Sequence, residues 1–227
     1  MPEIVWMPQT IKEQVYGIIK KDILNGVIKP GSWLQEKELA VKLKVSRSPV
    51  REVLKELVGE GLLENIPNKG VFVRELTEED IIDVFELRII IEKYAIEKAV
   101  ERINQTDVEE LRGILTHLKE AYRNEDVNLY CNIDAELHNA IICMSKNKLV
   151  YEVNEKVFYL LQPFRSMALN SKKRFEESFD EHRDMVEAII AKDAKTAWES
   201  DLNHLNRAKD EILRYLADNR LKLDKSL

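Results

Sequence analysis

Apolar residues recur at helical spacing through most of the chain. In the first such segment, residues 10–25, the apolar positions repeat at intervals of three and four and form one face: Ile11, Val15, Ile18, Ile19 and Ile23. Similar patterns and turn signals predict helices at 36–42 and 49–60, followed by a β-hairpin of 62–66 and 71–74. Three helices and a hairpin in this order are typical of a winged helix-turn-helix.

From residue 77 onward the pattern is helical without a strand signal. Long periodic segments predict six or seven helices, at 78–103, 107–124, 126–145, 147–169, 172–192 and 194–219. Capping-box sequences that begin at Thr77, Thr106 and Ser178 mark expected helix starts, so the fifth of these segments can be broken near Ser178. The fold expected is mainly α, with a DNA-binding winged helix-turn-helix at 1–76 and an all-helical bundle at 77–227.

Composition agrees with a globular helical protein in a reducing compartment. The chain has 227 residues, of which 44% are hydrophobic and 33% charged, with only seven glycines, six prolines and two cysteines. Two cysteines are too few for a disulfide scaffold. The sequence has no run of 18 apolar residues and no secretory signal pattern, so we expect no membrane association and a cytoplasmic location.

Charge is distributed unevenly along the chain. The formal net charge is −6, which alone argues against nucleic acid as a partner. However, residues 1–76 carry 12 Lys and Arg against 10 Asp and Glu, whereas residues 77–227 carry 23 against 31. Within 37–51 there are five basic residues and one acidic residue. This local excess predicts a polyanion-binding surface, with an ordinary solvated helix face as the alternative.

The third predicted helix is the candidate DNA-reading element. Its N-terminal residues Ser46, Arg47, Ser48 and Arg51 are those that meet bases and phosphates in a helix-turn-helix. Arg47 and Arg51 are four residues apart and share a face, and arginine can donate two hydrogen bonds to guanine. Serine hydroxyls at a helix start suit phosphate. At the tip of the predicted wing, Lys69 and Gly70 can approach the minor groove or the backbone.

Residues 11–74 resemble the DNA-binding domain of the GntR family of bacterial transcription regulators. The resemblance lies in ordered segments across the whole region: residues 23–31, Leu34, 38–40, 45–54, Leu57, 61–63 and 70–73. It implies that Arg47 and Arg51 contact DNA and that Gly70 is the wing glycine. Some members have arginine where this chain has Lys37, which suits a phosphate contact better than a bidentate base contact.

Three of the four histidines fall where a bundle can bring them together. Asp134 and His138 lie four residues apart on one helix, and His182 and His204 lie on two later helices. Three imidazoles and a carboxylate form a ligand set that suits Zn²⁺, and also Ni²⁺, Co²⁺, Fe²⁺ or Mn²⁺. The alternative is three unrelated histidines, because spacing across helices does not prove proximity.

Residues 79–216 resemble the FCD domain, the effector-binding half of FadR-type GntR regulators. The matching positions are 86–88, 91–92, Asp134, 137–138, Asn147, 181–182, 188–189, Asp193, Ala197 and 204–205. The resemblance implies that Asp134, His138, His182 and His204 hold a divalent metal ion, which anchors a small carboxylate or sugar-acid effector. It further implies a homodimer on double-stranded operator DNA, most members being repressors. An acyl-CoA ligand is not implied, because the fatty-acyl-CoA branch lacks this set.

Arg88 and Arg165 are candidates to pair with the carboxylate of the effector, with ordinary salt bridges to bundle glutamates as the alternative.

Two other functions would use the same four metal ligands. A metalloenzyme needs a general base beside the metal, but Glu136 and Glu181 lie off the ligand face and there is no HExxH motif, so we do not expect an enzyme. A metal sensor, in which the ion itself is the signal, stays open.

Overall fold

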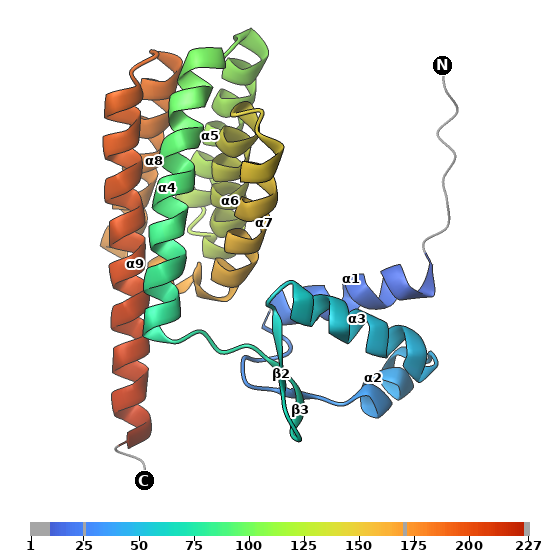
Figure 1. Ribbon diagram of the computed structural model, residues 1–227. Coiled ribbons are helices and arrows are strands. Elements are labelled where there is room, and N and C mark those ends of the chain that lie inside the picture. The colour runs from blue at the N-terminus through green and yellow to red at the C-terminus, as the bar shows by residue number, and fades with distance from the viewer. Residues whose placement is uncertain (1–9, 25, 170–171, 225–227) are drawn as a thin grey trace, which may run out of the picture. The chain divides into compact units, whose positions relative to one another are not determined.

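The computed structural model describes residues 10–24, 26–169 and 172–224, with side chains up to residue 218. The chain forms two units, Met1–Glu75 and Leu76–Leu227 (Figure 1). Each unit buries apolar side chains of its own. The first unit consists, in chain order, of α1 (Ile11–Leu24), β1 (Trp33–Leu34), α2 (Glu36–Leu43), α3 (Arg47–Gly59), β2 (Leu63–Ile66) and β3 (Gly70–Val73). This confirms the predicted winged helix-turn-helix.

Helix α3 is held by one apolar face. Val50, Val53, Leu54 and Leu57 are buried at helical spacing, and α3 packs on α1 and α2. Ser46 precedes the helix in extended conformation, but its side chain makes no capping hydrogen bond, so its hydroxyl is not used by the helix. The opposite face of α3, which carries the basic residues, is left at the surface.

The wing is a three-stranded antiparallel sheet with the order β1-β3-β2. Sequence analysis missed β1, because two residues are too few to show alternation. Trp33 of β1 pairs with Phe72 and its ring stacks on that residue at 6.5 Å between centroids. Gly70 has φ +111°, and a Cβ there would lie 2.7 Å from Nε1 of Trp33. Only glycine fits at this position, both for backbone conformation and for space.

The second unit is a helical bundle, as predicted. Its elements are α4 (Glu78–Arg102), α5 (Gln105–Arg123), α6 (Val127–Met144), α7 (Lys148–Leu161), the 3₁₀ turns η1 (Gln162–Phe164) and η2 (Met167–Leu169), α8 (Lys172–Ile190) and α9 (Ala194–Asp224). Helix α9 lies beside α4 and α8 (Figure 1). Helix α6 packs against both α4 and α5. Along the described helices there is no segment apolar and long enough to cross a membrane.

Three details of the predicted helices are wrong. The segment 147–169 is not one helix, because α7 ends at Leu161 and Pro163 in η1 has no N–H to continue it. Helix α5 is capped by Asn104 and not Thr106, since the Asn104 side chain accepts from the backbone N–H groups of Thr106 and Asp107. Ser178 lies inside an unbroken α8, where its buried hydroxyl is hydrogen-bonded to Tyr130.

The core of the bundle contains a polar layer. Most buried side chains are aliphatic or aromatic, among them Phe85, Leu111, Leu137 and Met185. Within this core, however, lie seven buried ionisable side chains from α4, α6, α8 and α9: Glu92, His138, Arg174, Glu181, His182, Asp201 and His204. Burying such groups is costly unless they are paired or bind a metal, so this layer is the candidate functional site.

Candidate functional site

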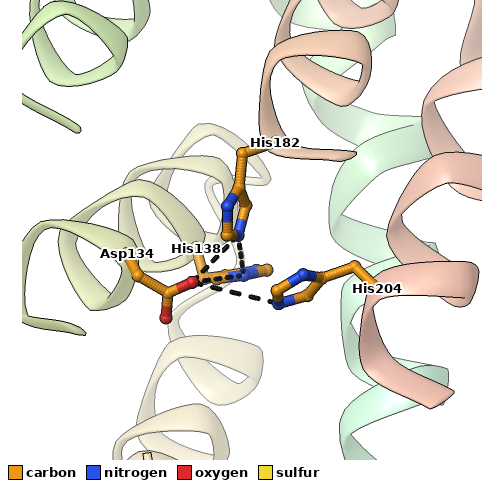
Figure 2. Close-up of side chains that lie close together, drawn as sticks. All are labelled: Asp134, His138, His182 and His204. Atoms are coloured by element: carbon orange, nitrogen blue, oxygen red, sulfur yellow. Dashed lines mark hydrogen bonds and ion pairs between the residues drawn. The ribbon is translucent and has the colours of Figure 1, made fainter. Parts of the chain in front are cut away.

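All four predicted metal ligands converge in the polar layer. Asp134 and His138 project from α6, His182 from α8 and His204 from α9 (Figure 2). One donor atom from each lies within 4.8 Å of the others. The structure therefore brings together the two predicted ligands of α6, which lie four residues apart, and the predicted histidines of two later helices.

The donor atoms point at one common centre. Oδ1 of Asp134 lies 2.9 Å from Nε2 of His182, 3.8 Å from Nε2 of His138 and 3.9 Å from Nε2 of His204. The Nε2 atoms of His182 and His138 are 3.3 Å apart. Tetrahedral ligands at zinc bond lengths are separated by about 3.3 Å, so these spacings fit one divalent ion. All three imidazoles present the same nitrogen, as a shared ligand requires.

The other nitrogen of each imidazole is held by a second residue. Nδ1 of His138 donates to Glu92 at 2.5 Å, and Nδ1 of His204 donates to Glu181 at 3.1 Å. Nδ1 of His182 lies 3.1 Å from the hydroxyl of Tyr130. Such contacts fix the tautomer and the ring orientation of metal-binding histidines. In His138 and His204, whose Nδ1 atoms face carboxylates, Nε2 is thereby left with a lone pair directed at the centre.

Each of the two glutamates is in turn paired with an arginine. Arg88 donates to Glu92 one helical turn away on α4, and Arg174 donates to Glu181 at 2.9 Å on α8. All four of these side chains are largely withdrawn from solvent. Buried ions are stable only when paired in this way. Two parallel chains of contacts result, Arg88–Glu92–His138 and Arg174–Glu181–His204.

Electrostatics favour ligand-competent protonation states. Burial lowers the pKa of His138 and, together with the charge of His182, holds the pKa of His204 well below its ordinary value. Burial would raise the pKa of Asp134, but the His182 hydrogen bond and the charges of the histidines hold it well below its ordinary value. Neutral imidazoles and an ionised carboxylate are the forms that bind metal.

Sequence reasoning gave no place in the site to four residues of this layer, which are Glu92, Arg174, Glu181 and Asp201. Glu92 was part of the family pattern but had no assigned role, and its position four residues after Arg88 was the available signal. Glu181 is not one of the four converging ligands, but its carboxylate accepts from His204 on α9. Asp201, one turn before His204, is fully buried, and burial and the charge of Glu92 raise its pKa well above the ordinary value.

A small cavity adjoins the four ligands. Asp134 and His204 line it together with three arginines, Arg88, Arg165 and Arg174, and with Cys131, whose thiol pKa burial raises to about 12. Its free volume of about 30 Å³ is that of roughly one water molecule. A small organic acid therefore enters only if the lining side chains move apart.

The two predicted effector-binding arginines differ in their surroundings. Arg88 is engaged by Glu92. Nη1 of Arg165 lies 3.8 Å from Oδ2 of Asp134, and its guanidinium stacks over Phe158 at 3.9 Å. The Nε of Arg165 is buried and has no hydrogen-bond partner among the described residues. Burial lowers the pKa of Arg165 to about 10. The nearby negative charge therefore does not fully offset the cost of burying this guanidinium.

The predicted DNA-contacting residues lie on the surface of the first unit. Lys37, Ser46, Arg47, Ser48 and Lys69 are exposed, and Gly70 opens β3. Arg51 is also exposed, but its guanidinium forms a two-point ion pair with Glu36. The predicted surface is therefore available to a polyanion, with the carboxylate of Glu36 paired to one of its arginines.

Fold and site together define a class of protein, a winged helix-turn-helix regulator with a helical C-terminal domain. Residues 11–73 match the family described as bacterial regulatory proteins, gntR family, and residues 83–207 match the FCD domain. The chain belongs to the GntR family and carries an FCD domain. It is a transcription regulator and not an enzyme.

Individual relatives agree with this assignment. The HTH-type transcriptional regulator YdhC of Bacillus subtilis is 28% identical over 207 residues, 90% of this chain and 92% of that protein. The gluconate operon transcriptional repressor of the same organism is 27% identical over 199 residues, 86% and 82% of the two chains. The solved structure of E. coli McbR/YncC shares the fold, with a TM-score of 0.78 at 23% identity over 92% of this chain and 100% of that chain.

Proposed function

We propose that this protein is a FadR-type repressor that releases operator DNA when a small organic acid binds beside a metal ion in the FCD domain. The observation that carries the proposal is the convergence of Asp134, His138, His182 and His204 on one centre, each histidine through Nε2. Zn²⁺ suits these ligands best, and Ni²⁺, Co²⁺, Fe²⁺ and Mn²⁺ are accepted by the same donors.

The effector is a carboxylate or sugar acid. A bound cation makes an otherwise acidic domain attractive to an anion, and its free coordination positions accept carboxylate oxygens. Arg165 is placed to receive a carboxylate directly, because its buried Nε has no hydrogen-bond partner among the described residues. Arg88 contributes positive charge to the same cavity while it holds Glu92. That one relative represses a gluconate operon makes sugar acids the first compounds to try.

DNA is bound by α3 and the wing, with Lys37, Ser46, Arg47, Ser48, Arg51, Lys69 and Gly70 at the interface. A two-fold operator is read by a two-fold protein, so the active form is a homodimer. Exposed apolar side chains on two helices that pack against each other, α4 and α7, support a dimer face there. They include Ile90, 67% exposed, and Leu149, 71% exposed.

Coupling between the two domains runs through α4. This helix begins at Glu78, directly after the DNA-binding unit, and carries both Arg88 and Glu92. Because the cavity is too small for an acid as it stands, binding must displace its lining, including Arg88 on α4. The resulting coupling free energy is of the usual size for allosteric proteins, about 1–3 kcal/mol.

The test uses protein purified without chelator or nickel resin. Elemental analysis should find about one transition metal per chain. A duplex selected by the protein from a random pool should lose affinity, by about 5–150-fold, when D-gluconate or another small acid of a panel is added. Operator binding that follows metal concentration and ignores every acid would make the protein a metal sensor. Absence of any bound or acquired metal would refute the proposed site.

A further inference from the structure

One acidic side chain stands among the basic residues of the DNA-reading face. Glu36 is the first residue of α2, and Arg51 lies in the second turn of α3. Nε of Arg51 donates to Oε1 of Glu36 at 2.8 Å, and Nη2 donates to Oε2 at 2.8 Å. Both carboxylate oxygens are therefore used, in the fork-to-fork geometry that is the most directional of ion pairs.

The pair lies between the recognition helix and the wing. Glu36 and Arg51 line a surface depression with Lys55 of α3 and with Asn65 and Gly70 of the wing strands. The side-chain hydrogen bond from Arg51 lowers the pKa of Glu36, with smaller effects from the charges of Arg47 and Lys55. The carboxylate is thus a fixed negative charge among the cations proposed to meet DNA.

As a source of stability this pair is worth little. The side chains of Arg51 and Glu36 are 57% and 35% exposed, and ion pairs at such sites contribute about 0–1 kcal/mol. Its geometry has a larger consequence for recognition. Arginine has five N–H donors, and Glu36 occupies two of them on one edge. The other donors, on Nη1 and Nη2, stay directed away from Glu36 and can still take a bidentate base contact.

We infer that Glu36 is a specificity-determining positioning residue, which holds the Arg51 guanidinium for base readout and keeps it from serving as a free cation for any phosphate. This inference rests on the proposed DNA-binding function. Holding a long side chain in one rotamer before binding reduces the entropy lost on binding. The negative charge of Glu36 also disfavours complexes in which a phosphate approaches Arg51 without the correct base beneath it.

The experiment compares Glu36→Gln with Glu38→Gln. Glu38 is exposed on the same helix and bonds to Gln35 and not to Arg51, so its substitution removes the same charge without releasing the arginine. The ligands are the duplex that the wild type selects from a random pool and a shuffled duplex of the same composition. Fluorescence anisotropy gives both affinities at several salt concentrations, and circular dichroism verifies folding.

The expected readout is the ratio of the affinities for selected and shuffled duplexes. Glu36→Gln should lower this ratio about tenfold, mainly by strengthening binding to the shuffled duplex, whereas Glu38→Gln leaves it unchanged. In an Arg51→Ala background, Glu36→Gln should have no further effect on the ratio. If Glu36→Gln left the ratio unchanged or raised it, the inference would be overturned while the proposed function would stand. Failure of the wild type to select any duplex would overturn it together with the proposed function.

Discussion

Glu181 of α8 and His204 of α9 are joined by a hydrogen bond of 3.1 Å from Nδ1 of the histidine to a carboxylate oxygen. Arg174 donates to that same oxygen at 2.9 Å, so the glutamate cannot turn away from His204 without losing its own partner. The equivalent contact from Glu92 holds His138. Two of the three imidazoles are therefore oriented by charged residues to which the sequence analysis gave no place in the site.

Removing one of these supports should weaken metal binding while the four ligands stay in place. Glu181→Gln keeps the size of the side chain but replaces the ionised acceptor, and substitutions of this kind reduce metal affinity about 10–100-fold. Zinc titration against a competing chelator measures the change. Glu136→Gln is the control, because Glu136 is exposed on α6 two residues from Asp134. Equal zinc affinities for the two variants would contradict the role given to Glu181.

Metal should stabilise the helical domain, and this stabilisation should require the four ligand side chains. In the wild type, zinc at 100 times its dissociation constant should raise the free energy of unfolding by about 2.7 kcal/mol. His138→Ala should lose most of this increment, since it removes a buried ligand. His117→Ala should retain it, because His117 is exposed on α5. Denaturation with and without zinc provides the measurement, and loss of the increment in both variants would count against the site.

Acid should destabilise the metal-free protein through its histidines. The folded-state pKa of His204 is held well below the ordinary 6.5, chiefly by burial. The unfolded chain therefore binds more protons in the window between these values, and stability falls as pH decreases through it. Between about pH 7.5 and pH 5.5, the wild type should lose more stability than His204→Gln. Asp201, whose raised pKa acts in the opposite direction, is present in both proteins. Parallel pH profiles for wild type and variant would refute this assignment.

The two cavity arginines should separate into different roles. Arg165→Met keeps the stacked stem but removes the charge, so binding of a small acid should weaken at least about tenfold while the metal content is unchanged. Arg88→Met releases Glu92, so it should lower zinc affinity as well. Calorimetry with the acid that binds the wild type best, together with elemental analysis, distinguishes these effects. An Arg165→Met protein that binds the acid normally would exclude Arg165 as its anchor.

Local patterns were sufficient for most helices of this protein and for the hairpin of β2 and β3, but not for the two-residue strand β1 or the 3₁₀ turns. The spacing of apolar residues located α3 and the long helices of the bundle, because each buries one face and therefore repeats with the helical period. Helix ends were less well predicted. Asn104 caps α5 in place of the predicted Thr106, and α7 ends just before Pro163 although the apolar pattern continues to residue 169. Caps and prolines act through single hydrogen bonds, which a periodic pattern does not record.

For the site, the sequence by itself determined which residue types were available: Asp134 and His138 on one helix face, and two further histidines on later helices. Only the tertiary structure decided that His182 and His204 meet them and that Glu92, Glu181 and Tyr130 direct their rings. It also decided that Glu36 engages Arg51 across two helices. The physical reason is range: helical periodicity fixes neighbours within about four residues, whereas contacts between helices depend on how their buried faces pack.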